Sequence, residues 1–319
     1  MNPFFIVNPH SANGATKRRF GSMEPTLRAA FPDMKVAYTE GPMHAATLSG
    51  EAVARGDELV VACGGDGTLN EVIQPVAGTG CKTVIAVMPS GTGGDFRRML
   101  GLKTEAEDIV GYLRHGEPRT VDTGILEYAN LAGGRDSRAF MNIASCGISG
   151  QVDHYVNNTS KALGGRASFL IGSLRGMFGY RNVEMSVKVD DRPFYEGPAN
   201  LVAVANGRFF GGGMMVAPGS SLDDGLFDVV VFGDLTKLEF IGLSRRIYSG
   251  HHLTHPKIRH GRGSTVEVES RDQALIDLDG EQVGGIPMRA GIRPASLRLL
   301  VPGRGAGVHP PLGVFGSSR

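Results

Sequence analysis

The chain has 319 residues, and its 41% hydrophobic and 20% charged residues are ordinary for a globular protein with a real core. This length predicts two domains. The chain has 33 Lys and Arg and 32 Asp and Glu, which gives a net charge of +1. A dedicated nucleic-acid-binding protein usually has a large basic excess, so this charge argues against a nucleic-acid partner. No apolar run approaches the about 20 residues of a membrane span, and no secretory signal is visible. Three cysteines without CxxC spacing disfavour disulfides and zinc, so we expect a cytoplasmic protein.

The first 125 residues alternate β-type runs with helical stretches. Strands are predicted at residues 4–8, 34–39, 58–63 and 83–88, and helices at 22–30, 43–54 and 68–76. This alternation is typical of a parallel sheet covered by helices on both faces. Ligands of such sheets bind beyond the carboxyl ends of the strands.

The second part of the chain changes character near residue 125. Short β-type runs are predicted at residues 125–128, 139–144, 183–189, 199–205, 227–232, 265–270 and 297–301. Two longer stretches, 153–181 and 235–253, interrupt them as helical insertions. We therefore expect an α/β domain over residues 1–125, a β-rich domain over 126–303 and a flexible tail over 304–319.

Glycine is twice as frequent as usual, with 47 residues, and part of this excess lies in the segment CGGDGT. Gly64, Gly65 and Gly67 precede or open a helix, where bare main-chain N–H groups and the helix dipole favour a phosphate. Asp66 would repel that phosphate unless Mg²⁺ or a hydroxyl proton lies between them. The alternative is a tight strand-to-helix turn with Thr68 as the N-cap.

Two further loops repeat this design. The segment PSGTGGDF follows the strand at 83–88, and VNPHSANG follows the first strand. Since parallel strands end at the same sheet edge, the three polar loops are expected to lie together and to bind an anion.

These motifs, VNPxSxxG, GGDGTLNEV and PSGTxxDF, resemble in order and spacing the diacylglycerol kinase catalytic-domain superfamily, and its bacterial two-domain lipid kinases most of all. Residues 205–231 and 276–287 resemble two later motifs of that family, so the resemblance runs from residue 5 to about 301. It implies a Rossmann-like α/β domain, as in NAD kinases and diacylglycerol kinases, followed by a mainly antiparallel β-sandwich. One departure is Gly94, where bacterial members commonly have asparagine.

The resemblance also implies an ATP site between the two domains. The residues that match the family's nucleotide-binding positions are Asn8, Thr39, Gly64, Gly65, Asp66, Gly67, Thr68, Asn70, Glu71, Gly91 and Thr92. No Gly-Lys pair is present, so a Walker A loop is excluded.

A structural Mg²⁺ site is implied at the main-chain oxygens of Ser221 and Leu226 and the side chain of Asp224. The general base implied by the DGE motif is Glu281, with Asp279 beside it, and Asp66 completes the catalytic set as a residue for a metal. We expect an ATP- and Mg²⁺-dependent kinase that converts a membrane lipid, first of all diacylglycerol to phosphatidic acid. An NAD kinase-like enzyme and a non-catalytic lipid-binding or regulatory protein remain as alternatives.

Two acid-free basic segments, residues 154–183 and 240–263, are candidates for contact with a membrane surface. The alternative for the first is an ordinary helix packed on the sheet. We therefore expect a cytoplasmic protein that associates peripherally with membranes, has a membrane lipid as substrate and binds no nucleic acid. A homodimer is left open.

Overall fold

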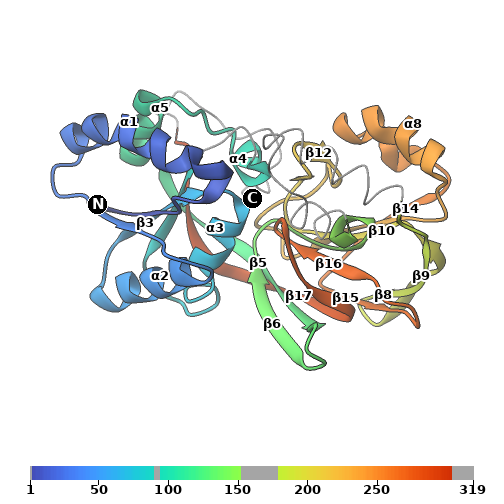
Figure 1. Cartoon of the computed structure of the whole chain (residues 1–319). Helices are drawn as coiled ribbons and strands as arrows, with labels where there is room; N and C mark the ends of the chain where they lie inside the picture. Colours follow the sequence, from blue (N-terminus) through green and yellow to red (C-terminus); the bar gives the residue numbers. More distant parts are fainter. Residues whose placement is uncertain (1, 90–93, 152–178, 304–319) are drawn as a thin grey trace. The chain divides into compact units, whose positions relative to one another are not determined.

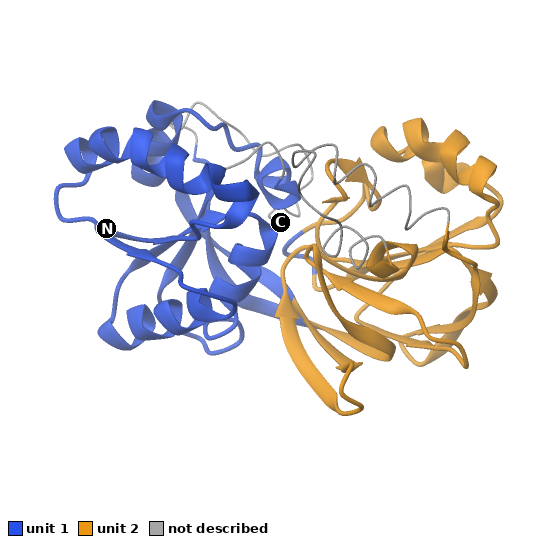
Figure 2. Ribbon diagram, viewed as in Figure 1, with its two compact units in different colours: residues 1–123, 222–224, 293–319 blue, residues 124–221, 225–292 orange. Residues whose placement is uncertain are grey.

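The computed structural model describes residues 2–89, 94–151 and 179–303 of the chain. It divides into two compact units, which Figure 2 colours separately. Unit 1 comprises residues 1–123, 222–224 and the chain from 293 onward, and unit 2 comprises 124–221 and 225–292. The first change of unit, between residues 123 and 124, lies beside the expected division at residue 125, but residues 222–224 and the chain from 293 onward return to unit 1.

Unit 1 is built on a parallel sheet. Its strands are β1 (Pro3–Val7), β2 (Lys35–Tyr38), β3 (Leu59–Gly64) and β4 (Val84–Pro89), in the spatial order β4-β3-β1-β2. All three pairings are parallel. Strands β1, β3 and β4 are apolar runs that are buried along almost their whole length, because both faces of the sheet are covered.

Helices cover this sheet on two sides. They are α1 (Ala15–Ala30), α2 (His44–Arg55), α3 (Asp66–Ile73), α4 (Asp95–Leu100) and α5 (Ala106–His115). In Figure 1, α1 and α5 lie on one side of the sheet, and α2 and α3 lie together on the other. This arrangement confirms the predicted doubly covered α/β architecture. Helix α1 begins seven residues earlier than predicted, and Gly21, which has open space around it, lies inside the helix.

Unit 2 is mainly antiparallel. The strands β14 (Ile258–Gly263), β13 (Phe227–Phe232), β10 (Leu201–Ala205), β7 (Ile143–Gly147), β16 (Leu275–Leu278) and the start of β17 (Glu281–Val301) are neighbours in that order. A second set joins β17 to β15 (Thr265–Glu269), β8 (Val183–Val189) and β9 (Arg192–Ala199). Strand β5 (Glu117–Ala129) pairs with β17 and with β6 (Arg135–Phe140). The predicted antiparallel β-rich fold is confirmed.

Alternate residues of the central strands are buried in two different hydrophobic cores, one on each face of the sheet. Val202 and Val204 of β10 face the core shared with β8 and β15, whereas Leu201 and Ala203 face the other side. That other side is covered by α8 (Lys237–Tyr248), through Leu243 and Ile247 among others. Because both faces are buried, β10 and β13 are continuously apolar in sequence.

The sequence prediction was wrong for one strand. The run 139–144 is not one strand, because the chain turns at Met141 and Asn142 between β6 and β7. The main-chain N–H groups at this turn bind the carboxylate of Asp279 instead of a neighbouring strand. The first predicted membrane segment, 154–183, lies mostly outside the described residues. Among those described, no helix is long and apolar enough to span a bilayer.

Candidate functional site

The polar loops of unit 1 follow strands that are neighbours in its parallel sheet. Asn8 follows β1 and donates its main-chain N–H to the Cys63 oxygen of β3, at 3.0 Å. Thr39 follows β2 and donates to the Val7 oxygen, at 2.9 Å, and is almost fully buried. These residues and Gly64 therefore lie at one sheet edge, as the strand order requires.

Asn8 joins the first loop to the GGDGT loop. Its amide nitrogen donates to the hydroxyl of Thr68, at 3.1 Å, across 60 positions of sequence. Its side-chain oxygen accepts the N–H groups of His10 and Ser11, which closes the turn after β1. Asn8 thus positions two of the three predicted loops relative to each other.

The glycines of GGDGT have different roles. A Cβ at Gly64 would lie 2.2 Å from the hydroxyl oxygen of Thr68, so this glycine is required by packing. A Cβ at Gly65 would meet nothing within 4 Å, so the backbone there is open to a ligand. Gly65 is the N-cap of α3, and Gly67 lies in its first turn. Thr68 is inside the helix, so the alternative in which it is the N-cap is wrong.

The Asp66 carboxylate holds the start of α4. One oxygen accepts the N–H of Asp95 at 2.8 Å and the other accepts the N–H of Phe96 at 3.2 Å. Asp66 therefore couples the GGDGT loop to the helix that follows the second predicted loop. Gly94 precedes α4 with φ of 82°, a conformation that favours glycine over most residues. The predicted nucleotide contacts Gly91 and Thr92 lie outside the described residues.

Asn70 and Glu71 form hydrogen bonds with other residues of unit 1. The Asn70 side chain is buried and accepts a hydrogen bond from Gln74, at 3.1 Å. Glu71 accepts the N–H of Ala45 at the start of α2, at 3.2 Å. A carboxylate at a helix N-terminus is favourable, so Glu71 anchors α2 to α3.

Three arginines gather beside the start of α4. Arg97 is half-buried, and its burial, with Arg98 and Arg19 nearby, lowers its pKa, while Asp66 and Asp95 act in the opposite direction. Arg98 pairs with Asp95 at 2.9 Å. Crowded guanidinium groups of this kind favour a bound anion. Sequence reasoning missed Arg19, although it lies in the segment that follows the first loop.

In unit 2, the two acids of the DGE motif occupy different environments. Asp279 is buried, and its carboxylate accepts the main-chain N–H groups of Met141, Asn142 and Ile143, each at 3.0 Å. This carboxylate connects the β6–β7 turn to the β16–β17 turn. Its oxygens are thus occupied by structural hydrogen bonds.

Glu281 is more accessible, with 38% of its side chain exposed. It forms an ion pair with Arg138 of β6, at 3.0 Å between Nη2 and Oε2. Arg138 is a further site residue that sequence reasoning missed, because 143 positions separate it from Glu281 and no motif includes it. The pair orients the more exposed of the two DGE carboxylates.

The predicted magnesium residues lie on a tight segment before β13. Leu222 in this segment is fully buried, and its carbonyl oxygen accepts the N–H of Asp122 of β5, at 2.6 Å. Asp122 is itself buried in β5, and it accepts the N–H of Ala295 at 2.8 Å. Within the ranges that the structure describes, no three His, Cys, Asp or Glu side chains cluster as a metal site. The predicted magnesium ligands are the main-chain oxygens of Ser221 and Leu226 and the single carboxylate of Asp224. A site of that composition would not contain three such side chains, so the lack of a cluster does not test it.

Two family profiles match most of the chain. The profile described as "Diacylglycerol kinase catalytic domain" matches residues 2–126, and the one described as "YegS C-terminal NAD kinase beta sandwich-like domain" matches residues 142–301.

Curated relatives match along nearly their whole length. A diacylglycerol kinase of Bacillus subtilis is 28% identical over 294 residues, which cover 88% of this chain and 90% of the relative. A protein of Pseudomonas aeruginosa named lipid kinase YegS-like is 30% identical over 281 residues, which cover 86% of this chain and 87% of the relative.

Solved structures share the fold. A diacylglycerol kinase from Bacillus anthracis aligns with a TM-score of 0.68 and 22% identity, over 94% of this chain and 96% of that one. Yeast NADH kinase aligns with a TM-score of 0.52 and 10% identity, over 96% of this chain and 84% of its own. At these identities the structural likeness supports the fold alone.

Proposed function

This chain belongs to the diacylglycerol kinase family, and from that premise we propose that it is a lipid kinase that transfers the γ-phosphate of ATP to a hydroxyl of a membrane lipid. Diacylglycerol, which would become phosphatidic acid, is the first candidate substrate. The names of the relatives from Bacillus subtilis and Pseudomonas aeruginosa support this class of substrate.

The observation that carries the proposal is the coupling of the strand-end loops of unit 1. Asp66 binds the N–H groups that open α4, and Asn8 binds Thr68, so the loops after β1 and β3 and the start of α4 form one connected structure. Open backbone at Gly65 and the arginines around Arg97 supply the donors and positive charge that a triphosphate requires. Phosphoryl transfer depends mainly on such positioning and charge neutralisation.

We assign the proton transfer to Glu281. Its carboxylate would accept the proton of the lipid hydroxyl as that oxygen bonds to the γ-phosphorus and ADP leaves. Arg138 is a positioning residue, since it holds this carboxylate by the ion pair. Asp279 is less suited to the step, because its oxygens already accept three main-chain N–H groups.

Mg²⁺ would neutralise phosphate charge, and we propose two places for its ligands. Ser221, Asp224 and Leu226 offer only oxygen donors, which suits this ion. Their segment is held in place by the hydrogen bond from Asp122 to the buried Leu222. Asp66 directly follows Gly65 in the sequence, although its oxygens also accept the N–H groups that open α4.

A panel of acceptors tests the activity. Purified protein is given radiolabelled ATP with diacylglycerol, monoacylglycerol, ceramide, sphingosine, phosphatidylglycerol or NAD. We expect label in a lipid, first of all in diacylglycerol. Label in NAD alone would favour the NAD kinase alternative, which the fold likeness to yeast NADH kinase keeps open. Absence of label with lipid binding retained would favour a non-catalytic protein.

The role of Glu281 is tested by Glu281→Gln, with Glu267→Gln as a matched control. Glu267 also pairs with an arginine of β17, Arg289, at 3.6 Å. Loss of a general base costs about 10²–10⁴ in rate, so we expect at least about a hundredfold fall in kcat for Glu281→Gln and little change for the control. A kcat within about threefold of the parent for Glu281→Gln would refute the assignment.

A further inference from the structure

Helix α8 exposes an apolar face to solvent. Leu238, Ile241 and Tyr248 are 82%, 45% and 52% exposed, and they are half of the large exposed hydrophobic residues among those described. With Arg245, they recur at intervals of three, four and three residues, which places them on one side of the helix. An ordinary surface helix is polar on this side.

The opposite side of α8 packs on unit 2. Leu243 and Ile247 are buried in the core cluster that contains Phe232 and Leu201. The exposed apolar residues therefore cannot turn inward, since another set already occupies that side. Helix α8 is thus apolar on two faces, of which only one is covered by the described residues.

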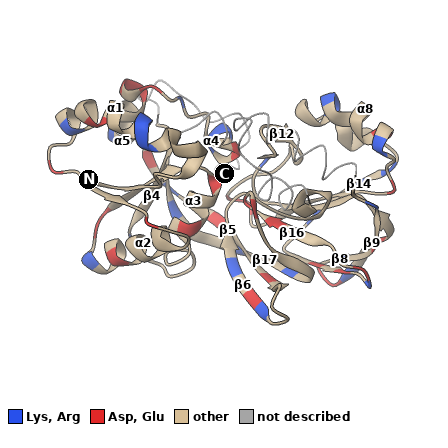
Figure 3. Cartoon of the chain, viewed as in Figure 1, with Lys and Arg blue, Asp and Glu red and all other residues tan. Residues whose placement is uncertain are grey.

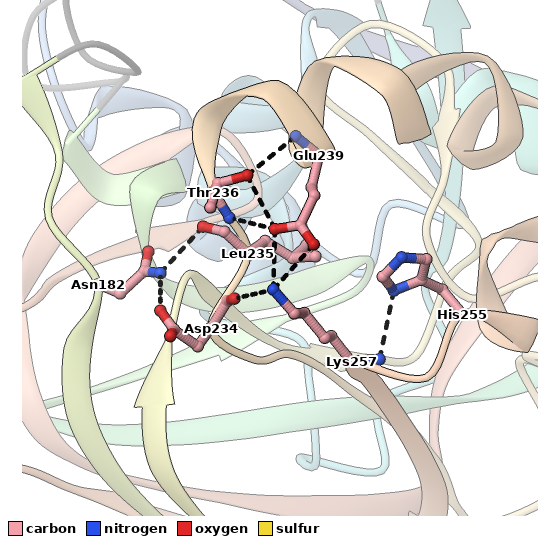
Figure 4. A network of polar contacts seen from close by, with 7 residues as sticks. All are labelled: Asn182, Asp234, Leu235, Thr236, Glu239, His255 and Lys257. Carbon is pink, nitrogen blue, oxygen red and sulfur yellow. Dashed lines mark hydrogen bonds and ion pairs between the residues drawn. The ribbon is translucent and has the colours of Figure 1, made fainter.

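A polar network fixes the start of α8 (Figure 4). Thr236 and Glu239 form a capping box, and Lys257 pairs with Glu239 at 2.8 Å. Lys257 also donates to the carbonyl oxygen of Asp234, and Asn182 donates to the Asp234 carboxylate, each at 2.8 Å. These hydrogen bonds and this ion pair fix both the turn before α8 and the first turn of the helix. They therefore hold α8 in one orientation.

The charge around the exposed face is positive. Lys237, Arg245 and Arg246 are exposed on the helix, where Figure 3 shows basic segments. The one acidic residue of α8, Glu239, forms an ion pair with Lys257, which offsets its negative charge. Apolar side chains flanked by cations match the boundary between the acyl chains and the anionic headgroups of a bilayer.

We propose that α8 docks this enzyme on anionic membranes by inserting Leu238, Ile241 and Tyr248 between lipid headgroups. The choice of a bilayer as the partner rests on the proposed function, because a lipid kinase must reach a substrate held in a membrane. Arg245 and Arg246 add electrostatic attraction to anionic lipids, so the interaction weakens as salt rises.

Tryptophan fluorescence tests the insertion directly, because the chain contains no tryptophan. Leu238→Trp introduces a single probe on α8, and Leu131→Trp provides a matched control, since Leu131 of the same unit is 70% exposed. With vesicles of phosphatidylglycerol and phosphatidylcholine, we expect a blue shift and quenching by brominated lipid for Leu238→Trp only. Vesicle binding without a shift at this position, or the same shift at both, would overturn the proposal.

Vesicle co-sedimentation tests the energetics. The double variant Leu238→Ser/Ile241→Ser should bind anionic vesicles about tenfold more weakly or worse, because it loses two inserted apolar side chains. Arg245→Gln/Arg246→Gln should reduce binding by a similar factor and reduce its salt dependence. Leu131→Ser should bind as the parent does. If the parent itself does not sediment with vesicles, a protein partner would be favoured and the membrane proposal would fail.

A soluble substrate separates this proposal from the kinase activity. With a short-chain diacylglycerol in free solution, the serine double variant should keep the parent's rate, whereas its rate on vesicles should fall with its binding. A failure of the parent to phosphorylate any lipid would refute the proposed function, while the fluorescence shift would still support docking. An equal loss of rate on both substrates would indicate a damaged fold and overturn the assignment of α8 to docking.

Discussion

At the scale of single residues, glycines that look equivalent in the sequence have different physical reasons. Gly64 leaves room for the Thr68 side chain, whereas a Cβ at Gly65 would meet no atom within 4 Å. Only Gly64 is required by the packing of the described residues.

Alanine substitutions should separate these two roles. Gly64→Ala places a Cβ against Thr68, so we expect a loss of about 1–3 kcal/mol in the free energy of unfolding. Gly65→Ala should leave stability nearly unchanged, because the extended backbone there suits any residue, but it should raise the KM for ATP. Denaturant titrations and initial rates measure the two effects. Equal stability of the two variants would contradict the packing argument.

Asp279 should contribute mainly to stability. In Asp279→Asn, one carboxylate oxygen becomes an amide that faces main-chain donors, so at least one buried N–H loses its partner. We expect a destabilisation of about 2 kcal/mol or more, measured by chemical unfolding. Asp191→Asn is a matched control, because Asp191 is exposed and also has positive φ. A stable but inactive Asp279→Asn would instead indicate a catalytic role.

At the scale of elements, α8 depends on the ionised form of Glu239. The Lys257 ammonium and then the N–H and hydroxyl of Thr236 lower the pKa of this carboxyl from 4.5 to about 2. Because the folded-state pKa is depressed, its stabilisation is present above pH 4.5 and is lost as the pH falls towards 2.

The pH dependence of thermal unfolding tests this contribution. The parent should have a higher Tm than Glu239→Gln above pH 4.5, and the difference should shrink to nothing as the pH approaches 2. Glu196→Gln, which alters an exposed acid on β9, should follow the parent throughout. A Tm difference that is independent of pH would show that the ionised carboxylate is not what holds the helix.

At the scale of the whole molecule, β17 links the two units. Its first part pairs with β15 and β16 in unit 2, and its last part joins β4 in unit 1, where Leu299 pairs with Ile85. Tyr112 of α5 donates to the Leu300 oxygen at 2.8 Å, and burial raises the pKa of Tyr112. The last strand of the described chain therefore completes the first unit.

Truncation within this strand should unfold unit 1. A chain that ends at residue 292 loses four buried side chains, at Leu297, Leu299, Leu300 and Val301. At about 1.5–3 kcal/mol each, their loss is comparable with the about 5–15 kcal/mol that stabilises a domain. We expect an insoluble or molten product by circular dichroism and solubility. A chain that ends at Gly303 should fold as the parent does.

Much of the fold and part of the site could be predicted because they depend on local patterns. Apolar runs and periodicity located β8 and β13 with their observed bounds, and the spacing of the glycine-rich loops led to the family. Helix α5 was missed, although Ile109, Tyr112 and Leu113 form its buried face. The pairing of Arg138 with Glu281 had no local signal at all.

The sequence by itself determined the fold class, the polar strand-end loops and the family, since these follow from hydrophobic periodicity and from motifs of consecutive residues. Only the tertiary structure decided which acid of the DGE motif is occupied by main-chain N–H groups, which glycine is open, and which side of α8 the described residues leave uncovered. Those properties depend on neighbours that are distant along the chain, and burial and hydrogen bonding exist only once the chain has folded.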